Sequence, residues 1–255
     1  MQRIRAQKRR AERRGSGRRP TVLVTGASGG IGRAICLAFG EAGWRVGVHY
    51  RTRPREAART AALVRARGGA AACLQADVRD GKQAQEMINQ LLDRWGRLDV
   101  MICNAGVAAS ELVLRAGTEA WTAVVDTNLT GTFHCLRAAG PVMIRQRGGA
   151  VLVVGSLAGL QGAAGQAAYA SSKAGLTGLV KTAAKEWGAH NVRVNLILPG
   201  WQKTALAGPA FPGKAPADHV LGRTPARAAV ADIICRLALL PDSSGQVWNL
   251  DSRIV

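Results

Sequence analysis

A glycine-rich turn between a short apolar run and a helical run is the feature that most restricts the fold. The segment Thr21–Thr25 favours a buried strand, the turn Gly26–Gly32 follows with the spacing G-x-x-x-G-x-G, and a helical pattern runs from Arg33 to Ala42. Such a turn can simply close a strand–helix joint. With a strand before it and a helix after it, the turn instead favours a dinucleotide site. Glycines let the backbone approach a pyrophosphate, and the N–H groups at a helix start bind its negative charge.

The order of apolar runs beyond this turn predicts an α/β architecture. Strand-like runs alternate with helical patterns, which is typical of a parallel, doubly wound sheet in one domain. The strand-like runs begin near Thr21, Arg45, Ala71, Asp99, Ala150, Val192 and Gln246. The helical patterns cover Glu56–Arg67, Lys82–Trp95, Trp121–Arg145, Ala168–Trp187 and Ala226–Leu240. The segment 200–222 breaks the alternation with prolines and glycines, and loops beyond the carboxyl edge of such a sheet shape the ligand site.

Tyr169 and Lys173 are the strongest candidates for a catalytic pair. They lie four residues apart in Y-A-S-S-K, within a helical pattern, so the phenol and the ammonium share one helix face. A lysine cation beside a tyrosine lowers the pKa of the phenol from its ordinary value near about 10. Ser156, at the end of the run V-L-V-V-G-S, can orient a carbonyl oxygen toward the phenol. The arrangement predicts a general acid that acts on a ketone or alcohol, although such pairs also occur on solvated helices.

These motifs resemble those of the short-chain dehydrogenase/reductase family from about Pro20 to about Leu250. The resemblance lies in the turn Thr25–Gly32, in Asn104–Gly106 after the apolar run Val100–Cys103, in Asn128, Ser156, Tyr169 and Lys173, and in Pro199–Gly200. It implies a single Rossmann domain with a parallel sheet of about seven strands. It also implies that the segment 200–222 forms a lid over the substrate, and that the chain forms a homotetramer or a homodimer.

The resemblance further assigns a catalytic tetrad, Asn128, Ser156, Tyr169 and Lys173, and a reaction. Ser156 would bind the substrate oxygen and Tyr169 would protonate it, while hydride passes from a nicotinamide to the carbonyl carbon. Lys173 would bind the nicotinamide ribose and lower the pKa of the phenol. Asn128 would hold a water that links Lys173 to solvent, although an asparagine there can also mark a local helix kink.

The residues after the second strand-like run favour NADPH over NADH. An acid there would bind the ribose 2′-hydroxyl of NAD, but this chain reads His49–Arg53, with Arg51 and no acid, and Arg33 follows the glycine turn. Guanidinium groups suit a 2′-phosphate, although these arginines can also belong to a generally basic surface. Asp77 and Val78 resemble the family's pair beside the adenine ring. The predicted cofactor contacts are Thr25, Gly26, Ser28, Gly30, Ile31, Gly32, Arg33, Arg51, Asp77, Val78, Asn104, Ala105, Gly106, Tyr169, Lys173, Pro199 and Gly200.

Composition predicts a globular protein of the cytoplasm. The chain has 255 residues, 47% of them hydrophobic, and no apolar run approaches the about 18 residues of a membrane span. The five cysteines are scattered and form no C-x-x-C pair, which favours reduced thiols over a disulfide framework or a metal site.

Residues 1–19 carry a large part of the net charge of +19 and are predicted to form a disordered arm ahead of the domain 20–255. The arm has arginines and Lys8 against the single acid Glu12, and no aromatic residue lies between them, which disfavours a stacking site for single-stranded nucleic acid. A solvated tail or a start codon placed too early explains the arm without a function. Binding to nucleic acid or another anionic surface is the functional alternative.

The substrate is the least constrained prediction. Within the family, the segments Y-A-S-S-K-A-G-L, N-V-R-V-N-L-I-L-P-G and V-H-Y-R-T-R-P most resemble the β-ketoacyl-(acyl carrier protein) reductases. That resemblance implies a 3-oxoacyl thioester on acyl carrier protein, as in fatty-acid elongation, with Arg147 and the position of His190 flanking the site and meeting the carrier. The alternatives are an NADP-dependent reductase of free ketones, sugars or other alcohols, and an NADPH-binding regulator that uses its basic arm. The C-terminal Asn249–Arg253 departs from the D-G-G end usual in the family.

Overall fold

A seven-stranded parallel sheet organises the chain in the computed structural model, which describes residues 19–204, 206, 208 and 218–254. The strand order is β3-β2-β1-β4-β5-β6-β7, and every neighbouring pair is parallel. The strands are β1 Thr21–Val24, β2 Arg45–Tyr50, β3 Ala70–Gln75, β4 Val100–Cys103, β5 Gly149–Val154, β6 Val192–Leu198 and β7 Val247–Asn249. The predicted doubly wound, about seven-stranded Rossmann sheet is therefore confirmed.

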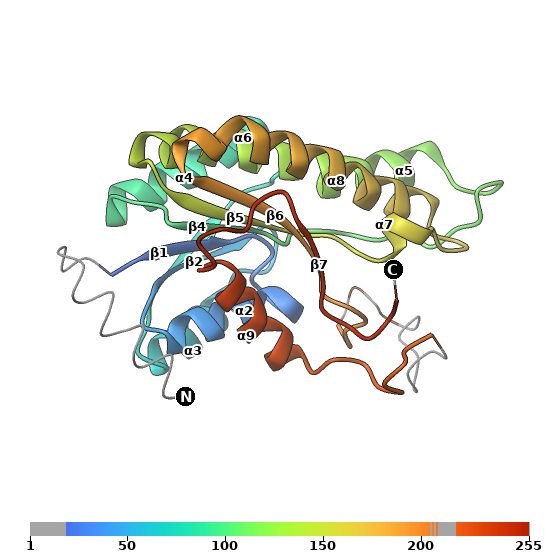
Figure 1. The fold of residues 1–255 in the computed structure, drawn as a ribbon, viewed down its shortest axis with the longest axis horizontal. Coiled ribbons are helices and arrows are strands. Elements are labelled where there is room, and N and C mark those ends of the chain that lie inside the picture. Colours follow the sequence, from blue (N-terminus) through green and yellow to red (C-terminus); the bar gives the residue numbers. More distant parts are fainter. Residues whose placement is uncertain (1–18, 205, 207, 209–217, 255) are drawn as a thin grey trace.

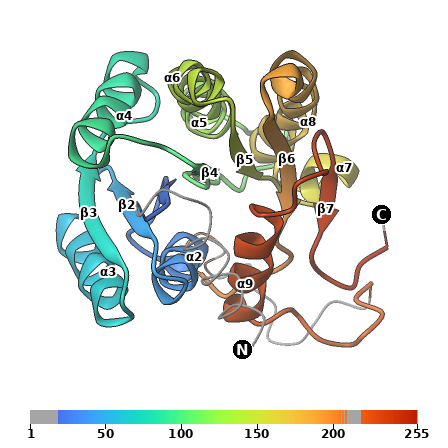
Figure 2. The same cartoon turned by 60° about the vertical axis from the view of Figure 1, so that its left-hand side comes forward.

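Helices cover both faces of this sheet, as Figures 1 and 2 show. One layer contains α2, α3 and α9, and the other contains α4, α5, α6 and α8. Their bounds are α2 Gly30–Glu41, α3 Pro54–Ala66, α4 Gly81–Trp95, α5 Thr118–Val125, α6 Gly131–Gln146, α7 Ala158–Gln161, α8 Ala167–Trp187 and α9 Arg227–Leu237, with short turns η1 Asp126–Thr130 and η2 Gly188–His190. The strand order reverses between β1 and β4, and in open sheets of this kind ligands bind at the carboxyl ends of the strands beside that switch point.

Two apolar cores, one on each face, explain why the strands read as almost continuous apolar runs. Leu23, Met101 and Val151 belong to the core shared with α4, α6 and α8. Val22 and Ile102, one residue away on the same strands, belong to the core shared with α2, α3 and α9. Parallel strands that are covered on both faces lose the alternation of polar and apolar residues.

The helix predicted from Trp121 to Arg145 is interrupted, and this is the main difference from the sequence prediction. α5 ends at Val125, the π-helical turn η1 follows, and α6 begins at Gly131. A π turn contains one more residue than an α turn and often lies at a functional site. Asn128, in this turn, is the residue for which a local helix irregularity had been the alternative interpretation.

The remaining boundaries agree with the predictions to within a few residues. The largest shifts are of three residues: α2 begins at Gly30 and not at Arg33, and α9 ends at Leu237 and not at Leu240. Pro241 lies four residues after the end of α9, and a proline disfavours the helical conformation of the residue before it, here Leu240. Residues 1–18 of the predicted arm and 209–217 of the predicted lid lie outside the described residues. Within the described part, no helix has the length and apolar character needed to cross a membrane.

Candidate active site

The turn between β1 and α2 has little room for side chains. Gly26 and Gly30 have φ angles of 64° and 56°, a region that L-residues rarely adopt. A Cβ atom on Gly32 would lie 2.4 Å from the carbonyl oxygen of Gly26, so a side chain there would require the loop to move. Gly29 precedes the first turn of α2 in an extended conformation, and no side chain caps the helix. The N–H groups of that first turn are therefore left for a ligand, and an anion fits them best.

Thr25 and Asn104 tie this turn to the end of the neighbouring strand β4. The Thr25 hydroxyl accepts hydrogen bonds from the backbone N–H of Asn104 (2.9 Å) and of Ala105 (3.0 Å). The Asn104 side-chain amide donates in return to the carbonyl oxygens of Thr25 (2.9 Å) and Gly26 (3.2 Å). The two motifs that were predicted separately from the sequence thus form one hydrogen-bonded unit.

His49 also holds the turn, and the sequence analysis gave it no role. Its Nδ1 accepts from the Gly26 N–H at 3.0 Å, and its Nε2 lies 3.0 Å from the carbonyl oxygen of Ala76. Since Nδ1 is an acceptor, the proton of the neutral ring is on Nε2 and is donated to Ala76. Burial lowers the pKa of His49. Its only sequence signal was a histidine at the end of a buried strand.

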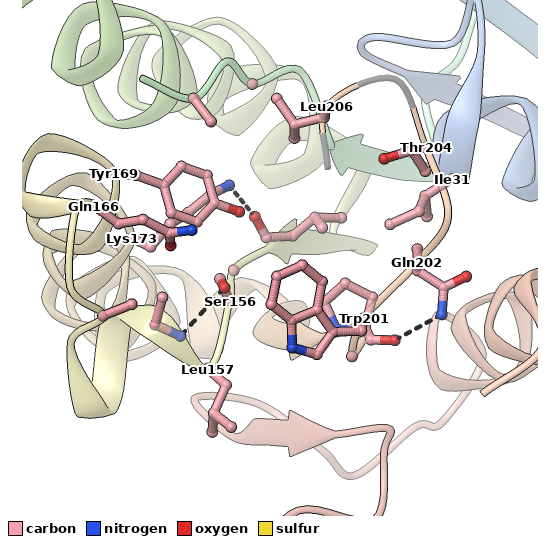
Figure 3. A pocket seen from close by; sticks show the side chains of 18 of the residues that line it. Ile31, Ser156, Leu157, Gln166, Tyr169, Lys173, Trp201, Gln202, Thr204 and Leu206 are labelled. Atoms are coloured by element: carbon pink, nitrogen blue, oxygen red, sulfur yellow. Dashed lines mark hydrogen bonds between the residues drawn. The ribbon is translucent and has the colours of Figure 1, made fainter. Parts of the chain in front are cut away.

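A cavity of about 330 Å³ opens at the carboxyl edge of the sheet, beside this turn. Ser156, Tyr169 and Lys173 all line it, and Figure 3 shows the three side chains around one space. Of the predicted cofactor contacts, Ile31, Asn104, Gly106, Pro199 and Gly200 line the same cavity. Residues from five separate parts of the sequence therefore meet at the switch point.

The direction of the Tyr169 pKa differs from the prediction. Burial raises the pKa of the phenol, and the hydrogen bond with the Ser156 hydroxyl lowers it by less. Lys173 was expected to lower this pKa, but its Nζ lies 5.7 Å from the centroid of the Tyr169 ring and donates to the carbonyl oxygen of Val154 at 2.7 Å. The tyrosine is therefore held in its protonated form at neutral pH, which suits a proton donor.

Lys173 is almost wholly buried, with 5% of its surface exposed. Removal from water disfavours the ammonium and lowers the pKa of Lys173 to about 8. At neutral pH the side chain still carries most of its positive charge. Gly106 lies close by, since a Cβ atom on it would be 3.8 Å from Nζ of Lys173 and 3.1 Å from Oδ1 of Asn128.

Asn128 does not line the cavity, but its side chain is bonded to residues that are next to lining residues in the sequence. Its Oδ1 accepts from the Val107 N–H at 2.9 Å, and its Nδ2 donates to the Val107 carbonyl oxygen and to the Ser172 hydroxyl, both at 3.0 Å. The Ser172 hydroxyl donates to the Tyr169 carbonyl oxygen at 2.7 Å. The side chain of Asn128 is thus used to join η1, the segment after β4, and α8.

The predicted nucleotide-contacting charges lie in α2, beside the glycine turn, and after the ends of β2 and β3. The Arg33 guanidinium donates to the Ser28 carbonyl oxygen (2.6 Å) and to the Thr60 hydroxyl (3.0 Å), which places it under the glycine turn. Arg51 Nη1 is 3.8 Å from a carboxylate oxygen of Asp77. Arg79 binds the same carboxylate through two nitrogens, and this hydrogen bonding lowers the pKa of Asp77.

The structure does not bring Arg147 to the cavity of its own chain. Arg147 precedes β5 and is joined to Asn191, which precedes β6, through a bond from the Asn191 amide to the Arg147 carbonyl oxygen (3.3 Å). Ser156 and Pro199 follow the same two strands at their other ends. A six-residue strand spans about 20 Å, so Arg147 and His190 lie away from the cavity of their own chain.

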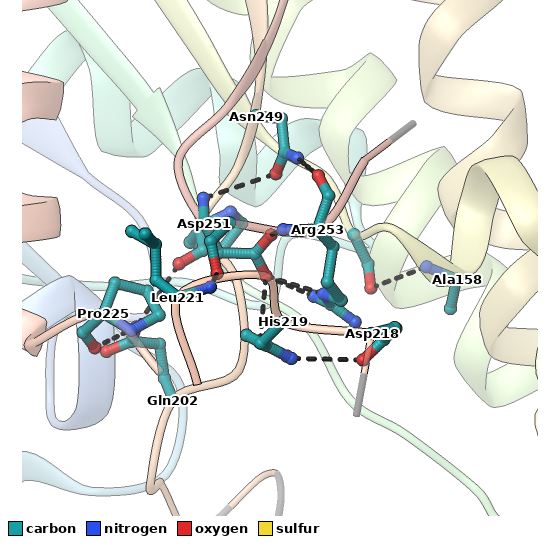
Figure 4. A network of polar contacts seen from close by, with 12 residues as sticks. Ala158, Gln202, Asp218, His219, Leu221, Pro225, Asn249, Asp251 and Arg253 are labelled. Atoms are coloured by element: carbon teal, nitrogen blue, oxygen red, sulfur yellow. Dashed lines mark hydrogen bonds and ion pairs between the residues drawn. The ribbon is translucent and has the colours of Figure 1, made fainter. Parts of the chain in front are cut away.

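Several lining residues of the cavity had no place in the prediction. Arg253 comes from the C-terminal segment after β7 and Gln166 from the turn before α8, whereas Asp218 lies within the predicted lid segment 200–222 but was not among the predicted contacts. Figure 4 shows the polar network around Arg253, which includes His219 and Asp251. The departure of Asn249–Arg253 from a D-G-G end was the one sequence signal for this part of the site.

Known proteins with similar sequences include dehydrogenases and reductases. A family model described as short chain dehydrogenase matches residues 20–215. The 3-oxoacyl-[acyl-carrier-protein] reductase FabG of Staphylococcus epidermidis is 40% identical over 181 residues, which are 71% of this chain and 74% of that protein. The 3-oxoacyl-[acyl-carrier-protein] reductase of Synechocystis sp. is 40% identical over 185 residues, 72% of this chain and 75% of that protein.

Solved structures are similar to this chain over a larger part of its length than these two sequences are. A protein from Sinorhizobium meliloti 1021 that is assigned to the short-chain alcohol dehydrogenases superposes with a TM-score of 0.84 at 32% identity, covering 93% of this chain and 96% of that one. A protein from Burkholderia xenovorans that is assigned to the short-chain dehydrogenase/reductases gives a TM-score of 0.83 at 27% identity, covering 93% and 98%.

Protonation of His49 should destabilise the glycine turn. Because the pKa of His49 is lowered in the folded protein, its contribution to stability is complete above the ordinary value of 6.5 and is lost as the pH falls below it. His49→Gln, which keeps an acceptor and a donor but does not titrate, should show a smaller fall in melting temperature than the wild type between pH 7.5 and about 5. His190→Gln is the matched control and should follow the wild type. Parallel curves for all three proteins would contradict this role.

Proposed function

The chain belongs to the short chain dehydrogenase family, an oxidoreductase family, and on that premise we propose that it is an NADPH-dependent reductase of a 3-oxoacyl thioester on acyl carrier protein. The observation that carries the proposal is the meeting of Ser156, Tyr169 and Lys173 in one cavity beside the glycine turn. The non-catalytic alternative, an NADPH-binding regulator, gives no reason for a phenol, an ammonium and a hydroxyl to share that cavity.

The residues present fit a dinucleotide. The turn from Gly26 to Gly32 leaves space and uncapped N–H groups where a pyrophosphate would be held, and a side chain at Gly32 would close that space. Asn104, Gly106, Lys173 and the Pro199–Gly200 segment would hold the nicotinamide half, and Asp77 with Val78 the adenine half. When bound, the cofactor supplies the hydride that reduces the carbonyl carbon.

The chain's own residues supply orientation and a proton. The Ser156 and Tyr169 hydroxyls, which are hydrogen-bonded to each other, would bind the carbonyl oxygen of the substrate. Burial keeps the Tyr169 phenol protonated, so its Oη can donate a proton to the oxygen as negative charge develops there. The Lys173 ammonium, fixed by Val154, would then stabilise the phenolate and return a proton toward it. We propose that Asn128 serves this transfer by fixing Ser172 beside Lys173 and, as the family resemblance implies, by holding a water.

The preference for NADPH rests on the charges at the end of β2. Arg51 is half exposed there, and its side chain can turn to a 2′-phosphate as a charge-assisted donor. Asp77, the nearby acid, is already engaged by Arg79 through two hydrogen bonds. The acid is therefore largely neutralised, and the region keeps a net positive charge suited to a phosphate.

The choice of a carrier-bound thioester rests on the relatives, because both curated relatives described above are named 3-oxoacyl-[acyl-carrier-protein] reductases. Arg147 remains a proposed carrier contact. Because it lies at the amino-terminal edge of the sheet, such a contact would deliver the substrate to the cavity of another copy in the proposed homotetramer or homodimer.

Removal of the phenol hydroxyl tests the mechanism. Tyr169→Phe should lower turnover by roughly 100-fold or more, the scale of general acid catalysis, and should leave cofactor affinity nearly unchanged. Steady-state rates and calorimetric titration with NADPH measure the two effects separately. Wild-type turnover in this variant would contradict the assignment of Tyr169 as the proton donor.

Reversal of the charge at Arg51 tests the cofactor preference. In Arg51→Asp, the ratio of kcat/KM with NADPH to kcat/KM with NADH should fall by roughly 10-fold or more, since one charge-assisted contact to the 2′-phosphate is lost. Arg94→Asp makes the same charge change at the exposed end of α4 and should leave the ratio unchanged. Equal kcat/KM values with both cofactors in the wild type would refute the NADPH assignment.

Attachment of the substrate to its carrier tests the proposed substrate. Acetoacetyl carrier protein should have a kcat/KM roughly 10-fold or more above that of the same acyl group on a small thiol, because carriers are acidic and this chain is basic. Arg147→Glu should reduce that gain, and Arg94→Glu should not. If the carrier gives no gain, the reductase acts on free ketones, sugars or other alcohols. A gain that Arg147→Glu leaves intact would remove only the Arg147 contact.

A further inference from the structure

Arg253 is placed in the cavity by the part of the sequence that departs from the family's usual ending. It lines the same cavity as Ser156 and Tyr169, and only 12% of its side chain is exposed. A D-G-G end would have a glycine here and no side chain in the cavity. A buried guanidinium of this kind requires fixed partners, since burial of an unpaired charge is costly.

Asp251 is that fixed partner. Its carboxylate is fully buried, and one oxygen accepts from Arg253 Nε at 2.8 Å and from Nη2 at 2.6 Å. The other oxygen accepts from the Arg253 backbone N–H at 3.0 Å. The Asn249 side chain donates to the Arg253 carbonyl oxygen at 2.7 Å. The orientation of the guanidinium is therefore set before any substrate arrives.

The network is also packed against the segment after β6. A Cβ atom on Gly200, which has a φ of 75°, would lie 2.6 Å from Cβ of Asp251. On another side, His219 Nε2 lies 3.6 Å from the Asp251 carboxylate, and His219 pairs with Arg253 through their backbones. Figure 4 shows Arg253, Asp251 and His219 together. Arg253 thus has a defined position relative to Pro199–Gly200.

One edge of the guanidinium remains for a ligand. Nε and Nη2 face Asp251, whereas Nη1 makes no hydrogen bond to any residue that the structure describes. An arginine held along one edge presents its remaining N–H donors in a fixed plane. Those donors suit an oxygen atom of a molecule in the cavity.

The local charge favours a neutral oxygen over a carboxylate. Asp218 also lines the cavity, and its carboxylate is 3.2 Å from His219 Nδ1. Asp251 already pairs with the single guanidinium of Arg253, and the carboxylate of Asp218 is a second negative charge at the same cavity. An additional anion would be repelled by Asp218, whereas a carbonyl oxygen can accept from Nη1 without that cost.

We propose that Arg253 is a specificity-determining residue that binds the second carbonyl oxygen of a 1,3-dicarbonyl substrate, the thioester oxygen of a 3-oxoacyl group. This inference rests on the proposed reductase function, in which Ser156 and Tyr169 bind the ketone oxygen. Two fixed oxygen sites would select substrates with two carbonyl groups over simple ketones.

Two matched substrates test this assignment. S-ethyl 3-oxobutanethioate has both carbonyls, whereas 4-(ethylthio)butan-2-one has the same chain with CH2 in place of the thioester carbonyl. Arg253→Gln should lower kcat/KM for the thioester by roughly 10- to 100-fold, the effect of one hydrogen bond from a charged donor, and for the simple ketone by less than about 3-fold. For each substrate, the kcat/KM of the variant is divided by that of the wild type. This ratio cancels the difference in intrinsic reactivity between the two substrates.

Two further variants separate specificity from folding. Asp251→Asn combined with Arg253→Gln removes both charges together and leaves no buried carboxylate without its partner, so it should fold and show the same selective loss. Arg236→Gln removes an exposed arginine of α9 and should change neither rate. Equal losses on both substrates, or no loss on either, would overturn the proposal. Free acetoacetate, which has a carboxylate in place of the thioester, serves as a third substrate. A loss of kcat/KM confined to acetoacetate would also overturn the proposal, because it would assign Arg253 to a carboxylate.

A binding measurement distinguishes failure of this inference from failure of the proposed function. S-ethyl 3-hydroxybutanethioate keeps the thioester oxygen, and its affinity can be measured by calorimetry without cofactor. Arg253→Gln should weaken that binding by roughly 10-fold or more relative to the wild type. A wild type that binds it but reduces neither ketone would contradict the reductase function alone. Unchanged binding in the variant would overturn the role of Arg253 whatever the rates.

Discussion

The pairing of backbone groups where the chain leaves β1 is the constraint on which the site depends. A loop at the edge of a sheet loses its strand partners, and a buried N–H or C=O without a partner costs about as much as a lost hydrogen bond. His49, Thr25 and Asn104 replace those partners around Gly26, and they come from the carboxyl ends of β2, β1 and β4. Because each belongs to a different strand, the register of the sheet fixes the shape of the loop and of any site built on it.

The same edge of the sheet aligns α8. Lys173 is bound to the last carbonyl of β5, and the adjacent Ser172 is bound to Asn128 in the π turn. Two neighbouring residues of one helix are thereby attached to two different elements, which prevents the helix from rotating or sliding. Tyr169 is one turn earlier on this helix, so its position beside Ser156 follows from the bonds that hold the helix.

The sequence predicted what depends on local pattern and missed what depends on tertiary contacts. Runs such as Val22–Val24 and Val151–Val153 are apolar because both faces of a parallel sheet are buried, and the strand prediction followed directly. Asn128 in the π turn is bonded to Val107 and Ser172, residues 21 and 44 positions away, and no local pattern predicts such bonds. The pKa of Tyr169 rises because burial outweighs its hydrogen bond, and neither quantity can be derived from a four-residue spacing.

The buried ammonium of Lys173 has a cost in stability. Its pKa is about 8 in the folded chain against an ordinary value of 10.5, so folding disfavours its charged form. The cost is complete below pH 8, where both folded and unfolded chains carry the charge, and disappears as the pH rises to 10.5. At neutral pH it is on the order of 3 kcal/mol, a sizeable part of the stability of a domain. An apolar side chain would avoid this cost, and the proposed return of a proton to Tyr169 gives a reason for the chain to keep the buried lysine.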